Sequence, residues 1–169
     1  MEKSNIYLVG FMGTGKTAAG KALAAKKKWQ FLDLDELIEL RQKRAIADIF
    51  AKEGEPYFRR IEKQALKEAS LQKKFVVACG GGIVLDEENI KIMRETGVMV
   101  CLTAPAKVIL ERTKRYSHRP LLNVSEPLKQ IEHLLKLRAP FYGKADNTID
   151  TSRKTIKEIV DEILKRTKK

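Results

Sequence analysis

Gly10-Phe11-Met12-Gly13-Thr14-Gly15-Lys16-Thr17 is a full match to the phosphate-binding pattern G-x-x-x-x-G-K-[ST]. The apolar residues 6–9 precede this stretch, and the helix-forming residues 18–25 follow it. In such a strand–turn–helix context, backbone N–H groups and the N-terminus of the helix surround a phosphate. A flexible glycine turn is the alternative, but a chance match to the whole pattern is rare. We therefore predict that Lys16 contacts the β- and γ-phosphates of a nucleotide and that the Thr17 hydroxyl binds Mg²⁺.

The composition is that of one globular domain. The chain has 169 residues, of which 43% are hydrophobic and 33% are charged, and its apolar stretches are too short to span a membrane. The first expected strand begins near residue 5, which leaves no room for a signal peptide. Cys79 and Cys101 lack metal-ligand spacing, so we expect two buried free thiols. We therefore expect a single domain over residues 1–169, in the cytoplasm and without a membrane partner.

The net charge of +12 admits two interpretations. One is a basic face that binds nucleic acid, and the other is a site for small anionic substrates with the remaining lysines in solvent. The clusters 26–28, 73–74 and 165–169 lie at the ends of expected helices and lack interleaved aromatic residues for stacking on bases. Lysines are also favoured at helix C-termini by the helix dipole. We therefore favour the second interpretation and expect no nucleic-acid partner.

Apolar runs alternate with helical patterns along the whole chain. We expect strands at 5–9, 30–33, 75–78, 98–102 and 147–150, and helices near 16–28, 35–50, 56–72, 87–95, 105–113, 127–137 and 155–165. This alternation indicates an α/β fold with a parallel sheet covered on both faces. In such a sheet, ligands bind beyond the C-terminal ends of the strands. Polar residues at those ends are therefore the candidates for chemistry.

Two carboxylates, Asp33 and Asp35, lie at the end of the expected strand 30–33. A phosphate-binding loop usually has a partner carboxylate that holds Mg²⁺. The strand 75–78 is followed by glycines and has no acid, so we assign this role to Asp33. Asp35 is then available to orient an acceptor hydroxyl and to take its proton. The alternative for Asp35 is that it caps the helix that follows.

Gly80-Gly81-Gly82 follows the strand 75–78 at the same edge of the sheet. Consecutive glycines suggest close approach by a ligand or by another chain segment, although a plain tight turn is the alternative. Arg59 and Glu62 are i, i+3 neighbours on one face of the expected helix 56–72. The pair is either a surface ion pair of little energetic value or a carboxylate-held arginine that binds a substrate carboxylate. Spacing alone does not separate these two interpretations.

Two further arginines are candidates for binding anions. Arg138 continues the apolar stripe of the expected helix 127–137, so its burial would require an anionic partner, and Pro140 is expected to loosen or kink that end of the helix. Snorkelling at the helix end is the alternative. Residues 112–120 are basic and non-periodic, which indicates a mobile lid that brings cations to the phosphates. Arg119 is the candidate for stabilising charge on the transferring group.

Taken together, these residues resemble the shikimate kinase family over nearly the whole chain. The matching elements, in chain order, are the phosphate loop, Asp33-x-Asp35, Phe58-Arg59-x-x-Glu62, Gly80-Gly81-Gly82, Arg119-Pro120-Leu121-Leu122 and Arg138-x-Pro140-x-Tyr142. Each motif except the phosphate loop is weak alone, but all six in the family's order are specific. The resemblance implies transfer of the ATP γ-phosphoryl group to the 3-hydroxyl of shikimate, on the route to aromatic amino acids.

The resemblance also implies which residues bind which substrate. The implied nucleotide contacts are Gly13, Thr14, Gly15, Lys16, Thr17, Ala18, Arg112, Arg119 and Arg153, with Arg112 and Arg153 sandwiching the adenine. The implied shikimate contacts are Asp35, Arg59, Gly80, Gly81, Gly82 and Arg138, with the two arginines on the carboxylate. The catalytic residues would be Lys16, Asp35 and Arg119, and Mg²⁺ would lie at Thr17 and Asp33.

The expected architecture is a three-layer P-loop kinase fold with a five-stranded parallel sheet. Its order, 2-3-1-4-5, is implied by the family, as are a substrate-binding helical segment near 34–61 and a lid near 113–124. We expect a monomer that uses ATP and Mg²⁺. A P-loop kinase of another small hydroxy acid, such as gluconate, remains the alternative. A nucleic-acid-linked NTPase or a nucleotide sensor would need an acid at the end of the strand 75–78, which the sequence lacks.

Overall fold

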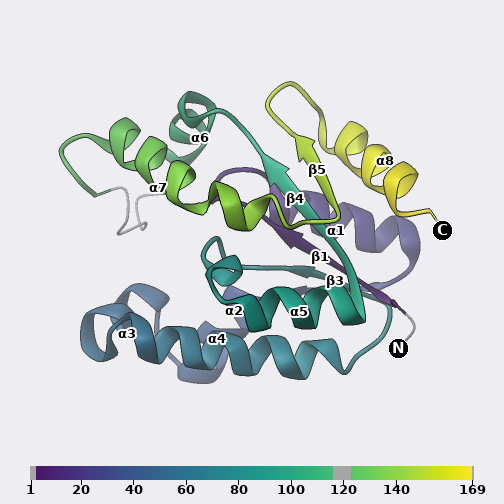
Figure 1. Cartoon of the computed structure of the whole chain (residues 1–169), viewed down its shortest axis with the longest axis horizontal. Helices are drawn as coiled ribbons and strands as arrows, with labels where there is room; N and C mark the ends of the chain where they lie inside the picture. Colours follow the sequence, from purple (N-terminus) through teal and green to yellow (C-terminus); the bar gives the residue numbers. More distant parts are fainter. Residues whose placement is uncertain (1–2, 116–122, 169) are drawn as a thin grey trace.

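The computed structural model describes residues 3–115 and 123–168, and its centre is one parallel β-sheet (Figure 1). The strands lie in the order β2-β3-β1-β4-β5, which confirms the expected order. Their bounds are Asn5–Val9 (β1), Gln30–Asp33 (β2), Phe75–Ala78 (β3), Gly97–Thr103 (β4) and Asn147–Asp150 (β5). In the register, Ala78 pairs with both Asp33 and Leu8, so β1, β2 and β3 end side by side.

Helices cover both faces of the sheet, so the fold has three layers with the sheet in the middle. The helices are α1 (Lys16–Lys27), α2 (Leu34–Gln42), α3 (Ile46–Glu53), α4 (Glu55–Ser70), α5 (Glu87–Thr96), α6 (Ala106–Thr113), α7 (Pro127–Tyr142) and α8 (Ile156–Thr167). Side chains of β1 alternate between the two cores, as expected for a strand buried on both faces. Ile6 and Leu8 pack with α1 and α8, whereas Tyr7 and Val9 pack with α2 to α5. The expected α/β class is therefore confirmed.

The helix expected at 35–50 is in fact two helices, so that expectation was wrong. α2 ends at Gln42, and Lys43 adopts a left-handed conformation with φ of 53° before α3 begins at Ile46. A left-handed C-cap residue is usually glycine, so a lysine in this position gave no signal of a break. α3 then turns back to pack against α4.

The helix expected at 127–137 continues through Pro140 to Tyr142. A proline inside a helix removes one backbone hydrogen bond and is unfavourable by about 3 kcal/mol. Here the last turn is held by Tyr142, which is buried and donates a hydrogen bond from its hydroxyl to the carbonyl oxygen of Gly81 at 2.6 Å. Tertiary contact therefore keeps this turn helical and joins α7 to the loop after β3.

None of the helices in the described part of the chain combines the length and the apolarity needed to cross a bilayer. Both cysteines are buried free thiols, as predicted.

Candidate active site

The phosphate loop lies between β1 and α1, at the C-terminal edge of the sheet. Gly15 is the N-cap of α1 and adopts φ of 96°, a left-handed conformation that favours glycine. Among the described residues, no side chain caps this helix N-terminus, and uncapped N–H groups of this kind can bind an anion. The ammonium group of Lys16 donates hydrogen bonds to the carbonyl oxygens of Gly10 at 2.6 Å and Phe11 at 2.9 Å. The Lys16 side chain therefore lies against the phosphate loop, close to where it is predicted to contact phosphates.

Asp33 joins the phosphate loop to the end of β2. Its Oδ2 accepts a hydrogen bond from the Thr17 hydroxyl at 3.0 Å, and its Oδ1 accepts from the backbone N–H groups of Asp35 and Glu36 at 3.0 and 3.1 Å. Asp33 is therefore the N-cap of α2, and the alternative that Asp35 caps the helix is wrong. The cap leaves the Asp35 side chain in the first turn of the helix, on the ligand edge of the sheet.

The oxygens of Thr17 and Asp33 are of the type that Mg²⁺ prefers. Mg²⁺ usually binds through one or two protein ligands and completes its octahedron with water and phosphate oxygens. Within residues 3–115 and 123–168, no group of three or more His, Cys, Asp or Glu side chains is arranged to hold a metal. The two neighbouring oxygens fit an ion that is held jointly with a nucleotide.

The three glycines at 80–82 lie against the predicted acceptor-binding side chains. A Cβ atom added to Gly80 would lie 2.9 Å from Asp35 Oδ1, and one added to Gly82 would lie 2.7 Å from Arg59 Cζ. At the middle glycine, the nearest atom to an added Cβ is Arg138 Nη1, at 3.2 Å. Side chains at these positions would displace the three groups. The close approach predicted from the glycine run is therefore confirmed, and a plain turn does not explain it.

Arg59 and Glu62 form a partly buried ion pair. Arg59 Nη1 donates to Glu62 Oε1 at 2.9 Å, and Nε and Nη2 of the same side chain donate to the exposed Glu55 at 3.2 Å. Glu62 is fully buried, and this burial raises its pKa from 4.5 to about 7, against the opposing effect of Arg59. A carboxylate with 0% exposure excludes the interpretation as a surface pair. Glu62 instead holds Arg59 against Gly82.

Arg138 is buried, with 7% of its surface exposed, and its guanidinium lies 5.5 Å from the ring centroid of Phe11. Among the described residues, no carboxylate forms an ion pair with Arg138, although its charge acts on the buried Glu62, whose pKa it lowers, and on the Tyr142 hydroxyl, with which it forms a hydrogen bond. The nearby Tyr142 is held to Gly81, and burial raises the pKa of its phenol to about 12. A buried guanidinium with no carboxylate in direct contact is a candidate for binding an anion.

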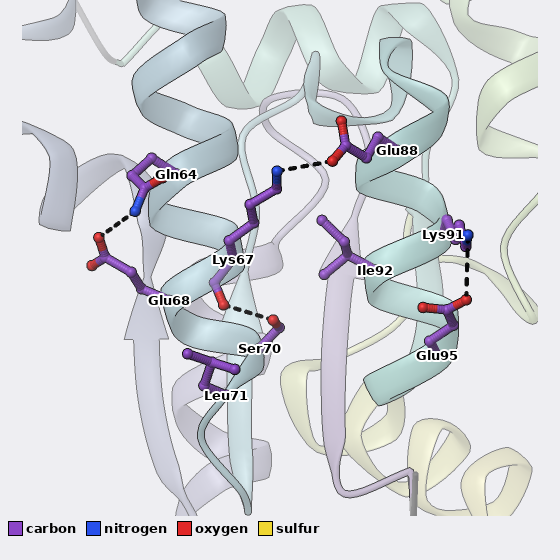
Figure 2. A pocket seen from close by; sticks show the side chains of 9 residues that line it. All are labelled: Gln64, Lys67, Glu68, Ser70, Leu71, Glu88, Lys91, Ile92 and Glu95. Atoms are coloured by element: carbon purple, nitrogen blue, oxygen red, sulfur yellow. Dashed lines mark hydrogen bonds and ion pairs between the residues drawn. The ribbon is translucent and has the colours of Figure 1, made fainter.

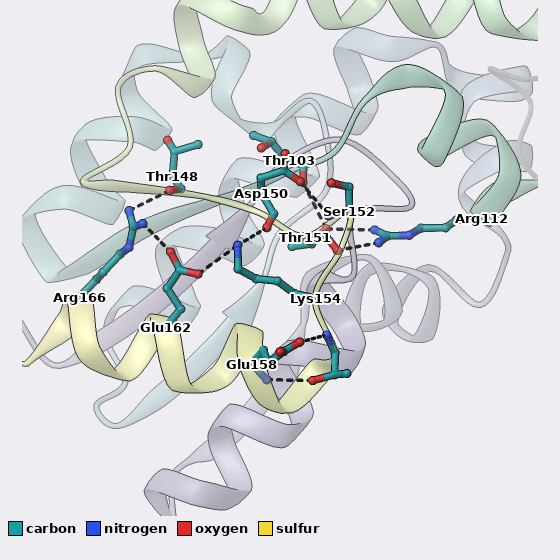
Figure 3. A network of polar contacts seen from close by, with 11 residues as sticks. Thr103, Arg112, Thr148, Asp150, Thr151, Ser152, Lys154, Glu158, Glu162 and Arg166 are labelled. Atoms are coloured by element: carbon teal, nitrogen blue, oxygen red, sulfur yellow. Dashed lines mark hydrogen bonds and ion pairs between the residues drawn. The ribbon is translucent and has the colours of Figure 1, made fainter.

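Arg112, in α6, contacts both the phosphate loop and Thr151, the residue after β5, beside which Figure 3 shows it. Its Nη1 donates to the carbonyl oxygen of Gly13 at 3.2 Å, and its Nη2 donates to the carbonyl oxygen of Thr151 at 2.8 Å. Arg153 is exposed, two residues farther along the chain. Arg153 therefore lies close in sequence to Thr151, the residue that Arg112 contacts. Thr151, which the sequence analysis missed, could have been found as a polar residue directly after a strand at the ligand edge.

Arg119 and most of the predicted lid lie outside the described residues, because the structure leaves out residues 116–122. The predicted roles of Arg119 and of the lid stay predictions.

The groove in Figure 2 is separate from this edge. It measures about 450 Å³ and lies between α4 and α5, and none of the predicted site residues lines it. Its walls carry ion pairs such as Lys67–Glu88, at 2.8 Å, so its charges are already neutralised within the protein. The P-loop edge is therefore the candidate active site.

Comparison with known proteins agrees with this arrangement. The family model described as shikimate kinase matches residues 12–168. A shikimate kinase from Caldanaerobacter subterraneus subsp. tengcongensis is 47% identical over 161 residues, which cover 95% of this chain and 94% of that protein. The chain belongs to the shikimate kinase family. Membership confirms the predicted enzyme class, an ATP-dependent kinase that phosphorylates an alcohol group.

Solved structures give the same result. The structure described as shikimate kinase from Acinetobacter baumannii in complex with shikimate has a TM-score of 0.92 and 39% identity, and covers 97% of this chain and 92% of that one. A gluconokinase from Sinorhizobium meliloti has a TM-score of 0.60 at 18% identity, covering 98% and 91% of the two chains. The second likeness shows a shared fold alone. The gluconate alternative therefore gains no support beyond the fold.

Proposed function

We propose that this protein transfers the γ-phosphoryl group of ATP to the 3-hydroxyl of shikimate, giving shikimate 3-phosphate and ADP on the route to aromatic amino acids. The observation that carries the proposal is Arg138, a buried guanidinium that forms no ion pair with any described carboxylate and lies beside Gly81. An anionic acceptor would place a carboxylate in direct contact with this guanidinium. The family relative solved with shikimate supports the identity of that acceptor.

The acceptor carboxylate would bind between Arg59 and Arg138. Both guanidinium groups lie against the glycines at 80–82, and they come from two different helices, α4 and α7. A guanidinium can hold a carboxylate by two parallel hydrogen bonds, which fixes the orientation of the substrate as well as its charge. The absence of side chains on the glycines would let the substrate ring approach the backbone closely.

Asp35 would act on the hydroxyl groups of the acceptor. Its carboxylate lies at the first turn of α2, beside Gly80 and on the same edge as the phosphate loop. From there it can orient the attacking hydroxyl and accept its proton. Phosphoryl transfer needs little covalent chemistry from the protein, so positioning and charge neutralisation dominate. Lys16 would leave its loop carbonyls for the phosphates, and Arg119 would add charge to the transferring group.

ATP would bind with its phosphates on residues 13–18 and its adenine between Arg112 and Arg153. Thr17 and Asp33 would hold Mg²⁺, which neutralises phosphate charge when it is bound. The hydrogen bond between these two side chains, at 3.0 Å, supports their placement on one ion. Further parts of the proposal are a single catalytic domain over residues 1–169, an acceptor-binding segment near 34–61 and a monomeric state in the cytoplasm.

The decisive experiment is a coupled assay of ADP release with ATP alone, with ATP and shikimate, and with ATP and gluconate. We expect turnover to depend on shikimate. Equal turnover with gluconate, or ATP hydrolysis that shikimate does not stimulate, would contradict the proposal.

Three variants locate the acceptor. Arg59→Lys and Arg138→Lys should each raise the KM for shikimate strongly and leave the KM for ATP nearly unchanged, because a point charge cannot reproduce the planar fork. Loss of one partner of a desolvated charge pair typically costs about 2–5 kcal/mol. Asp35→Asn should lower kcat as well. The exposed Arg60, next to Arg59 on α4, gives a matched control as Arg60→Lys. Equal effects of the arginine variants on both KM values would indicate a structural role instead.

A further inference from the structure

Thr151 directly follows β5 and is fully buried, although the proposed mechanism gives it no role. Its backbone N–H donates to the carbonyl oxygen of Thr103 at 2.8 Å, which extends the pairing of β4 and β5 by one residue. Its hydroxyl has two acceptors within reach, Thr14 O at 2.8 Å and Thr103 O at 3.2 Å. A hydroxyl donates one hydrogen bond, and the shorter distance assigns it to Thr14, in the phosphate loop.

The same residue also fixes Arg112. The Thr151 hydroxyl oxygen accepts a hydrogen bond from Arg112 Nη1 at 3.0 Å, and its carbonyl oxygen accepts one from Arg112 Nη2 at 2.8 Å (Figure 3). Arg112 Nη1 in turn lies 3.2 Å from Gly13 O. Since a guanidinium is planar and donates in fixed directions, these acceptors set its orientation before a ligand arrives.

These contacts hold two successive carbonyl groups of the phosphate loop, those of Gly13 and Thr14. In a planar trans peptide, the carbonyl of one residue and the N–H of the next point in opposite directions. A carbonyl that is held toward Thr151 and Arg112 therefore turns the N–H groups of Thr14 and Gly15 to the opposite side. Those N–H groups belong to the loop that binds phosphate through its backbone.

We propose that Thr151 is a positioning residue for the nucleoside triphosphate. Through one buried hydroxyl it orients the N–H groups of the phosphate loop, and through the same oxygen and its carbonyl it holds Arg112 at the predicted base site. The proposal rests on the proposed function for the identity of the nucleotide site. The rival explanation is that Thr151 only stabilises the junction of β4, β5 and α1.

The test compares Thr151→Val, which keeps the shape but loses the hydroxyl, with Thr151→Ser, which keeps the hydroxyl. The probe is ADP, whose Kd is measured by calorimetry without shikimate, followed by KM for ATP, KM for shikimate and kcat. We expect Thr151→Val to weaken ADP binding and raise the KM for ATP about tenfold, since one buried acceptor and one donor lose a partner. In Thr151→Val, the KM for shikimate should change less than about twofold. Thr151→Ser should bind ADP with a Kd within about twofold of the wild-type value.

Thr96 provides a matched control at the opposite edge of the sheet. It is also buried, and its hydroxyl contacts the Tyr7 hydroxyl at 2.7 Å and donates to Ile92 O at 2.8 Å. Thr96→Val should lower stability without changing the Kd for ADP. Two results for folded Thr151→Val would overturn the positioning role: an unchanged Kd for ADP, or equal increases in the KM for ATP and the KM for shikimate. An equal loss of ADP affinity in Thr96→Val would overturn it as well.

A second variant, Thr151→Ala, covers the event that the added methyl group of valine prevents folding. Loss of folding in both Thr151→Val and Thr151→Ala would make the residue structural and would also overturn the proposal. The outcome is separable from the proposed function, because ADP binding does not involve the acceptor. A wild-type protein that binds ADP but does not phosphorylate shikimate would refute the proposed function and leave the test of Thr151 intact.

Discussion

Replacing Glu62 by glutamine should change how the stability of the protein depends on pH. Glu62 is fully buried, and burial raises its pKa from 4.5 to about 7, while Arg59 opposes the rise and the charge of Asp35 adds to it. A shift of this size corresponds to about 3 kcal/mol, at about 1.4 kcal/mol for each pKa unit. The folded state binds the proton more tightly than the unfolded state. The contribution to stability is therefore fully present below pH 4.5 and is lost as the pH rises to about 7.

Urea unfolding of the wild type and of Glu62→Gln, at intervals between pH 4.5 and pH 8.5, measures this effect. The free energy of unfolding of the wild type should fall by about 3 kcal/mol relative to the variant across this range, with most of the fall below about pH 7. Taking the difference between the two proteins removes the contribution of groups that titrate alike in both. Glu55→Gln, which changes the exposed carboxylate on the same arginine, is the matched control and should follow the wild type.

A difference between the wild type and Glu62→Gln that stays constant across this range would refute the reasoning. It would mean that the carboxyl group at position 62 keeps its ordinary proton affinity in the folded protein, despite the absence of solvent exposure. The charge and hydrogen bond of Arg59 would then have to offset the effect of burial completely.

Three further predictions follow from the site and the fold. Gly82→Ala should raise the KM for shikimate at least about tenfold, because the new methyl group would displace Arg59. Gly143→Ala, at an exposed glycine, should leave this KM unchanged. The same KM for shikimate in Gly82→Ala and the wild type would refute the close contact. Lys43→Gly should raise the free energy of unfolding by about 1 kcal/mol, since glycine adopts the left-handed conformation without strain, and an unchanged urea midpoint would contradict it. Lys16→Ala should lower kcat at least about 100-fold with an unchanged circular dichroism spectrum, so near-normal turnover at saturating substrates would exclude its assigned role.

The strands and the phosphate loop could be predicted from the sequence because local chemistry marks them. β1, β2, β3 and β5 have the predicted bounds, and β4 differs by one residue at each end. Their order across the sheet depends on contacts between distant segments, and it came only from the resemblance to a family. The two errors in the helices have physical causes. Lys43 breaks a helix without glycine or proline, and Tyr142 keeps a helix intact beyond a proline.

The candidate site was predictable where residue type and spacing carry the chemistry. Asp35 and Arg138 could be named from their positions in the sequence, and the structure brings both to the glycines. The sequence offered Asp35 as the possible helix cap, whereas Asp33 takes that role, because the helix begins one residue earlier than expected, at Leu34. Spacing could not reveal the burial of Glu62 or the contact of Thr151 with the phosphate loop, since these depend on how distant elements pack.

The lack of side chains at Gly80, Gly81 and Gly82 affects how a kinase of this kind can change its acceptor. The glycines contribute no side chains to this part of the candidate site, and the groups that approach them come from α2, α4 and α7. In the proposed site, the nucleotide instead binds to the loop after β1 and the end of β5, with Asp33 at the end of β2 on its metal ion. Acceptor preference and nucleotide use would therefore depend largely on different side chains. Substitutions on three helices could therefore alter acceptor preference during evolution or design while nucleotide use stays unchanged.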